Sequence, residues 1–501
     1  MSSHDKTQAF LAISSQFQLG HLVTESFHPD TKNLSEVAKK NLPESLGLLQ
    51  AVDSKALELI KNQKPSLWKM AQAIQDTLKS GNKVFMCGCG ATGRLSLVLE
   101  TLYRQKFGNT DKVISFMAGG DFALIKSVES FEDRTEYGER QLMELRFGPH
   151  DLLLAPTEGG ETPFVIGACN QAAKISSRSP YFLYCNPDEL LLPVERSREV
   201  LENSRINKVN LTIGPMAISG STRMQASTVL MLGIGVGLLY QHSSFEDFSK
   251  FFDGFVSDLQ GTPYEKMAPL TSLEAKLYRE KKYLNYLADP NLAISVLTDT
   301  TERSPTFSLK GFENRLDESK DHSLSYLFIS EAQTSGHAWS ELLKRAPRAL
   351  EWSELSQRIG LTKVLGFDIS SQGHLTRTSS IPCVDFCITQ KGESISFKCE
   401  QEEVSFSWGL DPLFNHLMVK MLLNAHSTLI MGLLERYEGN VMTWVRPSNN
   451  KLIDRAARYI LRLLEQKGVS ASYPEIIQMI FEEIDTLSEN EAVVLKVLRR
   501  F

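Results

Sequence analysis

A glycine-rich turn near residue 88 has the residue types and the spacing to hold a phosphate group. The segment VFMCGCGATGRLS at residues 84–96 predicts a strand, a tight turn at residues 88–93 and then a helix. The first N–H groups of such a helix lack partners within the helix, and the positive end of its dipole lies beside them, so an anion is favoured there. In many α/β proteins a similar turn serves only to pack a helix on a sheet. This segment alone therefore leaves both interpretations open.

Three more polar turns follow predicted strands in the same part of the chain. They are AGGD at residues 118–121, TEGGET at residues 157–162 and GPMAISGSTRM at residues 214–224. Ligands of open parallel sheets bind beyond the carboxyl ends of the strands, so the four turns together predict a pocket for a polar small molecule. Between two of them, Glu129, Glu132 and Asp133 have the i, i+3, i+4 spacing of one helical face, which is most often a solvated acidic face.

The composition excludes several classes of protein. The 501 residues carry a formal net charge of −6, which gives no electrostatic reason to expect nucleic acid or an anionic membrane as a partner. Residues 1–20 lack the apolar core of a secretory signal, and the most apolar run, residues 229–240, is too short to span a membrane. The seven cysteines are scattered and form no zinc-ligand pattern with the histidines. We therefore expect a cytoplasmic protein with reduced thiols and with neither a metal nor a cofactor.

Alternating strands and helices would position these turns. Short apolar strands between helices imply a mostly parallel sheet that is buried on both faces. After a charged helical connector the alternation restarts, with strands predicted at residues 292–297 and 362–369 and shorter, alternating strands after residue 382. The expected fold is α/β, with two doubly wound, mostly parallel lobes and a C-terminal all-helical lid. The expected domains are an N-terminal arm (1–65), a first lobe with its connector (66–287), a second lobe (288–440) and the lid (441–501).

Several longer strings make the chain similar to a known family. GCGATGRLS, AGGD followed by SVESFED, CNPDE and IGPMAISGSTRM have the order and intervals of the sugar isomerase (SIS) domain of N-acetylmuramic acid 6-phosphate etherases and glucokinase regulatory proteins. The strings LTDTTERSPTF, LLKRAPRALEW and SNNKLIDRA, at residues 297–307, 342–352 and 448–456, resemble the second SIS lobe and the helical lid of the regulatory proteins. The resemblance therefore implies two SIS domains and a ligand site between the first of them and the lid.

The resemblance also implies which residues contact a sugar phosphate. Hydroxyl groups and helix-terminal N–H groups suit phosphate oxygens, a carboxylate suits sugar hydroxyls, and a lysine supplies a compact positive charge. Lys451 follows a segment in which Ser448 or Asn449 can cap a helix, so we expect its ammonium group to lie within reach of residues 88–93. The implied contacts are Thr92, Gly93, Glu132, Thr157, Glu158, Gly159, Ser221, Thr222 and Lys451.

The sequence departs from the etherase pattern at positions that matter for catalysis. An etherase needs one carboxyl group as a base and another as an acid. Glu132 aligns with the base, but the acid falls on Leu102, which cannot transfer a proton, and the nearby Glu100 would point about 200° away around the helix. The third turn carries Glu158 and Glu161, and two carboxylates would repel a phosphate unless they point away from it.

Two hypotheses remain. The first is a non-catalytic sugar-phosphate-binding protein in which the ligand bridges lobe and lid and so changes a surface for a partner, for which the resemblance implies a sugar kinase. The second is an enzyme, either an etherase-like lyase or an aldose–ketose isomerase, that uses Glu132 as its base. Leu102 favours the first hypothesis, because one positioned acid typically contributes ~10²–10⁴-fold to the rate.

Overall fold

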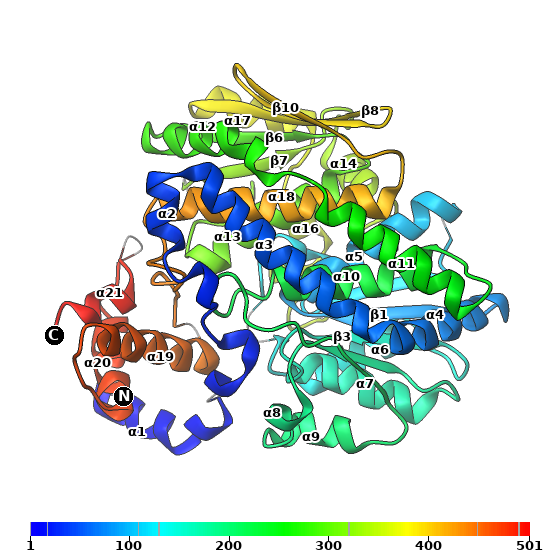
Figure 1. The fold of residues 1–501 in the computed structure, drawn as a ribbon, viewed down its shortest axis with the longest axis horizontal. Coiled ribbons are helices and arrows are strands. Elements are labelled where there is room, and N and C mark those ends of the chain that lie inside the picture. The colour runs from blue at the N-terminus through cyan, green and yellow to red at the C-terminus, as the bar shows by residue number, and fades with distance from the viewer. Residues whose placement is uncertain are drawn as a thin grey trace.

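The first lobe is built on a five-stranded parallel sheet with the strand order β2-β1-β3-β4-β5. Figure 1 labels β1 and β3 of this sheet. The computed structural model describes residues 2–17, 19–108, 110–128, 131–318, 321–447, 449–488 and 491–501. β1, β2 and β3 are buried along their whole length, as strands with helices on both faces must be. The strands are β1 Val84–Gly88, β2 Val113–Met117, β3 Leu152–Pro156, β4 Tyr181–Tyr184 and β5 Asn207–Asn210.

The second lobe repeats this arrangement with a different edge. Its sheet has the order β10-β9-β8-β6-β7, in which β6 pairs in parallel with both β7 and β8, while β9 and β10 extend the sheet as antiparallel strands. β6 therefore lies where β1 lies in the first lobe, with β7 in the place of β2. The prediction of two α/β lobes is confirmed, and strands are also found after residue 382 as predicted. The strands are β6 Tyr283–Ala288, β7 Ser325–Phe328, β8 Cys383–Lys391, β9 Ser394–Cys399 and β10 Glu402–Ser407.

Two strands predicted for the second lobe are wrong. Residues 292–297 lie in the helix α13 (Ala293–Phe307), and residues 362–369 mostly lie in the short helix α16 (Leu361–Gly366). The lobe opens instead with β6, within the segment predicted as a helical connector. The run at residues 292–297 is short and apolar except for Ser295, and the periodicity of such a run cannot distinguish a buried strand from a buried helix. Residues 362–369 mix apolar residues with Thr362, Lys363 and Asp368 and have no clear strand alternation.

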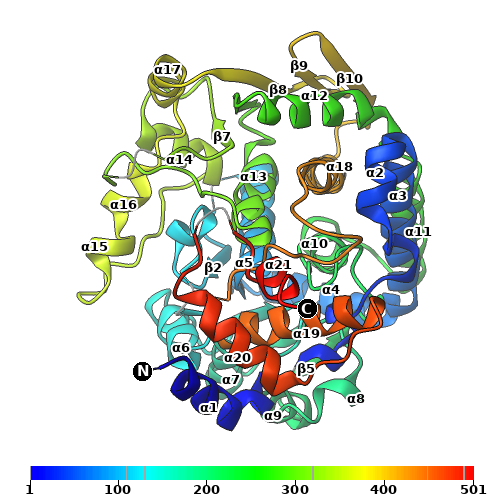
Figure 2. The same ribbon diagram turned by 90° about the vertical axis from the view of Figure 1, so that its left-hand side faces the viewer.

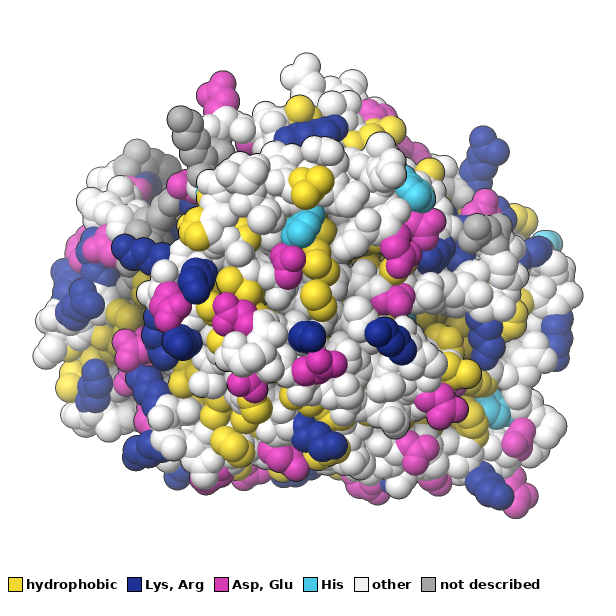
Figure 3. Space-filling model, turned by 90° about the horizontal axis from the view of Figure 1, so that it is seen from above, with side chains coloured by type: hydrophobic (Ala, Val, Ile, Leu, Met, Phe, Trp, Pro, Cys, Tyr) yellow, Lys and Arg dark blue, Asp and Glu magenta, His cyan; other side chains and the backbone are white. Residues whose placement is uncertain are grey.

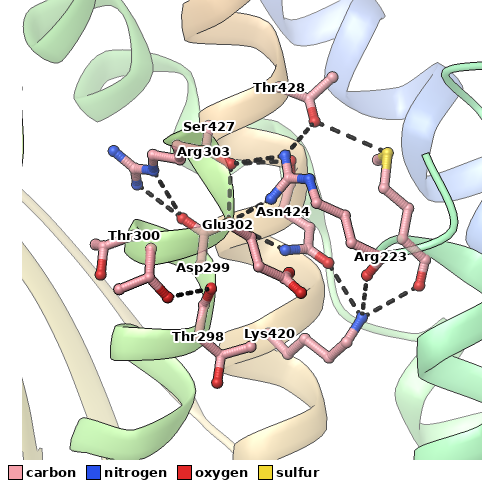
Figure 4. Close-up of polar contacts among 12 residues, drawn as sticks. Arg223, Thr298, Asp299, Thr300, Glu302, Arg303, Lys420, Asn424, Ser427 and Thr428 are labelled. Carbon is pink, nitrogen blue, oxygen red and sulfur yellow. Dashed lines mark hydrogen bonds and ion pairs between the residues drawn. The ribbon is translucent and has the colours of Figure 1, made fainter. Parts of the chain in front are cut away.

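A buried polar network joins the two lobes. Arg223, in the turn before α10 (Gln225–Leu239), contacts Asp299 of α13 and the hydroxyls of Ser427 and Thr428 in α18 (Pro412–Leu433), as Figure 4 shows. Arg223 and Asp299 are both buried, so each charge needs the other to offset the cost of leaving water. The lobes thus share an interface in which charges are paired, as well as apolar surface.

The two ends of the chain pack against each other at the lid (Figure 2). The helix α1 (Ser3–Ile13) of the arm lies on α20 (Tyr473–Ile484), with the rings of Phe10 and Phe481 6.1 Å apart. The lid also contains α19 (Asn450–Gln466) and α21 (Val493–Leu498). Asn449 caps α19 by accepting a hydrogen bond from the backbone N–H of Leu452 at 2.9 Å, whereas the other predicted cap, Ser448, lies outside the described residues.

The arm is more helical than the sequence suggests, since α3 runs over Leu42–Ile60 after α2 at Leu34–Lys40. All seven cysteines are free thiols. Within the described ranges no helix has both the length and the apolar character needed to cross a membrane. Positive and negative side chains are interspersed on the face shown in Figure 3.

The remaining helices are α4 Lys64–Lys79, α5 Gly90–Phe107, α6 Thr135–Glu144, α7 Pro163–Ile175, α8 Asp188–Leu191, α9 Glu195–Glu202, α11 Phe245–Gln260, α12 Ala268–Arg279, α14 Ser335–Leu343, α15 Ser356–Ile359 and α17 Ser371–Ser380.

Candidate functional site

A pocket of about 250 Å³ lies beyond the carboxyl ends of the first-lobe strands and is closed by the arm and the lid. Four of its walls are the turn after β1, the turn after β3, the turn before α10 and the start of α19. A larger groove of about 1130 Å³ lies between α11 and β10, but the predicted site residues are not among those that line it. The site residues that line the pocket are Glu132, Glu158, Gly159, Thr222 and Lys451, together with Glu25, Cys89, Gly90, Ala91, Glu161 and Arg455.

The predicted contacts Thr92 and Gly93 shape the first turn from behind the pocket. The Thr92 hydroxyl accepts a hydrogen bond from the backbone N–H of Cys89 at 3.0 Å and donates one to the Cys89 carbonyl at 2.9 Å, so it caps α5. A Cβ atom at Gly93 would lie 2.5 Å from Cβ of Met117, so glycine is needed where α5 meets the end of β2. The pocket is lined instead by the neighbouring Gly90 and Ala91.

The turn after β3 uses its hydroxyls internally. The Thr157 and Thr162 hydroxyls lie 3.0 Å apart, and the Gly160 N–H donates to Thr157 at 3.3 Å. The Gly159 carbonyl accepts a hydrogen bond from the Asn186 amide at 2.9 Å. Thr157 is therefore committed to holding the loop, while Gly159 remains at the pocket wall.

The two glutamates of this turn have opposite electrostatic surroundings. Burial alone would raise the pKa of Glu161, but Lys451 and Arg196, each 2.6 Å from its carboxylate, outweigh burial and lower the pKa to about 2. Burial raises the pKa of Glu158 to about 7, against smaller opposing effects of hydrogen bonds from its own backbone and from Ser227. The expected repulsion of a phosphate by both carboxylates therefore needs correction, because Glu161 is neutralised by cations and Glu158 is largely protonated below pH 7.

Lys451 connects the lid to the first lobe at the pocket. Its ammonium group lies 2.6 Å from Glu161 and 3.6 Å from Glu132. Burial would lower the pKa of Lys451, but Glu161 and Glu132 together raise it, so the side chain is positively charged. Its predicted position at the start of a lid helix is confirmed, and it lines the same pocket as Gly90 and Ala91.

Glu132 does not lie on a helical face. It occupies the turn before α6, which begins at Thr135, and its side chain lines the pocket and is 41% exposed. The predicted helix through Asp133 is therefore wrong at this end, and Glu129 lies outside the described residues. A turn position leaves the Glu132 carboxylate free to approach a ligand from the rim of the pocket.

The fourth turn contributes Thr222 to the pocket, while Ser221 is buried beside it. Both residues precede α10, which begins at Gln225. The Thr222 carbonyl lies 3.1 Å from the Ser227 hydroxyl, which also lies 3.0 Å from Glu158. Ser227 therefore links the third and fourth turns, and no sequence pattern pointed to it.

Neither Leu102 nor Glu100 can supply an acid to this pocket. Leu102 is fully buried in the core on α5. Glu100 faces the second lobe, where Arg348 and Arg345 contact its carboxylate at 2.9 and 3.2 Å. Burial would raise the pKa of Glu100, but these arginines and Arg104 lower it to about 2. The carboxylate is therefore ionised and holds the lobes together.

Sequence reasoning missed three charged residues of the site. Arg455, one helical turn after Lys451, donates to Glu25 of the arm, and Arg458 lies 3.2 Å from the same carboxylate. Arg196 of α9 supports Glu161. The spacing of Lys451, Arg455 and Arg458 in the lid string could have revealed this cationic face of α19.

Comparisons with known proteins find relatives of part of this chain. Residues 67–173 match the family model "Glucokinase regulatory protein N-terminal SIS domain". The N-acetylmuramic acid 6-phosphate etherase of Gloeothece citriformis (strain PCC 7424) is 32% identical over 218 residues, which cover 43% of this chain and 67% of the relative. The enzyme of the same name from Salmonella agona (strain SL483) is 28% identical over 245 residues, covering 49% of this chain and 77% of that one.

Solved structures with a similar fold are more distant. Tagatose-6-phosphate ketose/aldose isomerase from Escherichia coli aligns with a TM-score of 0.35 and 12% identity, over 54% of this chain and 65% of that one, just under two thirds of its length. Glucosamine-6-phosphate deaminase from Thermotoga maritima aligns with a TM-score of 0.35 and 10% identity, over 76% and 95% of the two chains. Values this low indicate a remote similarity and nothing about the site.

Proposed function

This chain belongs to the SIS-domain family of N-acetylmuramic acid 6-phosphate etherases and glucokinase regulatory proteins, and we propose that its lid-covered pocket binds a sugar phosphate. The observation that carries the proposal is the position of Lys451, a lid cation at the same pocket as the start of α5. The ammonium group and the helix N-terminus suit phosphate oxygens, and the Glu132 carboxylate suits sugar hydroxyls.

We further propose that Glu132 acts as the base of a lyase or isomerase reaction in this pocket. The matching relatives are named as etherases, which favours the enzymatic hypothesis over the purely regulatory one. The partly exposed Glu132 carboxylate can reach a ligand, and Lys451, 3.6 Å away, can stabilise negative charge that develops as a proton leaves carbon. Since Leu102 cannot be the acid, an etherase-like reaction requires a proton donor elsewhere in the pocket.

A second candidate is ligand-dependent regulation of a partner, for which a sugar kinase is the proposed example. It is favoured by the contact of Lys451 with two first-lobe carboxylates, because a ligand held by both lobe and lid stabilises the closed arrangement by its differential affinity. Occupancy of the pocket would then change the surface where lobe, arm and lid meet. This role needs no acid at residue 102.

Binding and catalysis can be tested in sequence. A thermal-shift screen with hexose 6-phosphates, hexose 1-phosphates and N-acetylmuramate 6-phosphate should reveal a ligand, since one at 100 times its Kd stabilises the fold by about 2.7 kcal/mol. Release of lactate from N-acetylmuramate 6-phosphate, lost in Glu132→Gln with binding retained, would support the lyase. Binding without lactate release or isomerisation would leave the regulatory candidate, and absence of binding to every probe would contradict the proposal.

A further inference from the structure

We infer that Glu158 is a neutral carboxylic acid in the ligand-free pocket and donates its proton to an oxygen of the bound sugar phosphate. The inference rests on the proposed function and assigns the donor that Leu102 cannot be. It also gives a reason for a glutamate in a turn that faces a phosphate.

The first support for the neutral form is the position of Glu158 in the pocket. Its side chain lines the same pocket as Glu132 and Lys451, and the residue is only 9% exposed. Among the residues that the structure describes, no cation forms an ion pair with it, in contrast to Glu161 three residues later. A buried carboxylate without a counter-charge is costly, so the neutral form is favoured.

The hydrogen bonds of Ser227 fit a neutral acid. The single Ser227 hydroxyl lies 3.0 Å from Oε1 of Glu158 and 3.1 Å from the carbonyl of Thr222. A hydroxyl has one proton, so when Ser227 donates it to Thr222 its oxygen can accept the proton of Glu158. A ligand oxygen entering the pocket can then take over this proton from Ser227.

The titratable groups around Glu158 come from four elements. Glu302 of α13 disfavours its ionisation, and Lys451 of α19 favours it, while the thiols of Cys89 and Cys185 lie near it on the first-lobe turns. Behind it, a small cavity of about 10 Å³ is lined by Ser227, Glu302 and Lys420, the last two drawn in Figure 4. Burial, with Glu302 acting in the same direction, outweighs Lys451 and the hydrogen bonds and raises the pKa of Glu158 to about 7.

The protonated acid has two consequences for the proposed ligand. Below pH 7 the pocket presents a donor where an ionised glutamate would repel phosphate. In an etherase-like elimination, Glu132 would take the proton on carbon, the C–H electron pair would become the new C=C bond, and the C–O bond would break with its pair on oxygen. That oxygen would receive the Glu158 proton, so atoms and charge balance without another reactant.

The test compares the pH dependence of binding in wild type and Glu158→Gln, which keeps the shape and a donor but cannot ionise. The Kd of N-acetylmuramate 6-phosphate and of glucose 6-phosphate would be measured by calorimetry between pH 6.5 and 8.5. For the wild type we expect affinity to fall by up to about tenfold per pH unit above 7, as Glu158 ionises. For Glu158→Gln we expect a profile that lacks this fall and keeps only the titration of the phosphate, which is common to both proteins.

A control variant makes the outcome specific. Glu465→Gln, which alters an exposed carboxylate outside the pocket, should leave the shape of the profile unchanged. Parallel profiles in wild type and Glu158→Gln would overturn the inference while leaving the sugar-phosphate site intact. Absence of binding by both proteins at every pH would overturn the proposed function and the inference with it.

Discussion

The turns after β1 and β6 occupy the same place in their two lobes but have different polar environments. After β1, the start of α5 opens onto the lid-covered pocket. After β6, the start of α13 is filled by His416 of α18, whose ring nitrogens lie 2.7 Å from the Ser295 hydroxyl and 2.7 Å from the Asn291 carbonyl. Burial lowers the pKa of His416 to about 4, so the ring is neutral and needs no counter-charge. The same fold position thus borders the candidate site in one lobe and is filled by packing in the other.

The rest of α13 is also committed to protein contacts. Arg303 is buried between Glu274, 2.7 Å from its guanidinium, and Asp299 at 2.8 Å. Asp299 in turn meets Arg223 of the first lobe. In the first lobe, by contrast, Glu132 and Glu158 of the pocket are without such arginine clamps among the described residues. The difference indicates that a candidate site can be recognised by polar groups whose capacity for hydrogen bonds and ion pairs is not fully used by other residues of the chain.

The largest effect should come from disrupting the buried ion pairs of α13 in the second lobe. Arg303→Met leaves Glu274 and Asp299 buried with part of their compensation lost, and removal of one partner of a buried ion pair typically costs about 3–5 kcal/mol. The free energy of unfolding, measured by urea denaturation, should fall by an amount of this order. Lys39→Met is the matched control, because Lys39 and Glu435 form an exposed pair, for which about 0–1 kcal/mol is usual. An equal loss in both variants would contradict the distinction between the lobes.

The next largest effect concerns the first-lobe pocket and acts on ligand binding. Lys451→Ala should weaken sugar-phosphate binding by roughly 10–100-fold, because a hydrogen bond to a charged group contributes about 1.5–3 kcal/mol. Stability should change little, since Lys451 is 28% exposed and Glu161 keeps its contact with Arg196. Calorimetry and urea denaturation on the same variant separate the two effects. Unaltered affinity would mean that the lid lysine only packs against the lobe.

A third prediction tests whether Gly93, in the turn after β1, is needed for packing or for contact with the ligand. Gly93→Ala should destabilise the protein by about 1–3 kcal/mol, because the new Cβ would collide with Met117 and with the Gly88 carbonyl, 3.1 Å away. Gly47→Ala, within α3 and with no atom within 4 Å of the added Cβ, should instead stabilise by about 0.5–1 kcal/mol. If Gly93→Ala folds as stably as wild type but loses ligand, Gly93 is a contact rather than a packing residue.

These contrasts also explain what the sequence could reveal. The strands of the first lobe were predictable because short apolar runs alternated with helices and ended in glycine-rich turns. The pocket position of Glu132 and the lid position of Lys451 followed from strings shared with a known family. The paired state of Glu161 and the neutral state of Glu158 could not be predicted, because the first depends on Arg196 and Lys451, which lie far away in the sequence, and the second on burial that exists only in the folded protein.

The smallest expected effect, and one of opposite sign, concerns competition within the pocket. Glu161 holds the Lys451 ammonium at 2.6 Å, so an incoming phosphate must share that cation with a carboxylate already in place. In Glu161→Gln the lysine keeps only the more distant Glu132, at 3.6 Å, and we expect sugar-phosphate affinity to rise by about two- to tenfold. The gain should shrink at high salt, because it is electrostatic. Calorimetric Kd values at 50 and 300 mM NaCl would measure this gain. The control is Glu465→Gln, because Glu465 forms an exposed ion pair with Arg462 on α19, the helix that carries Lys451. A fall in affinity would instead mean that Glu161 orients Lys451 for the ligand, and the first-lobe turn would then resemble α13 in depending on a preformed ion pair.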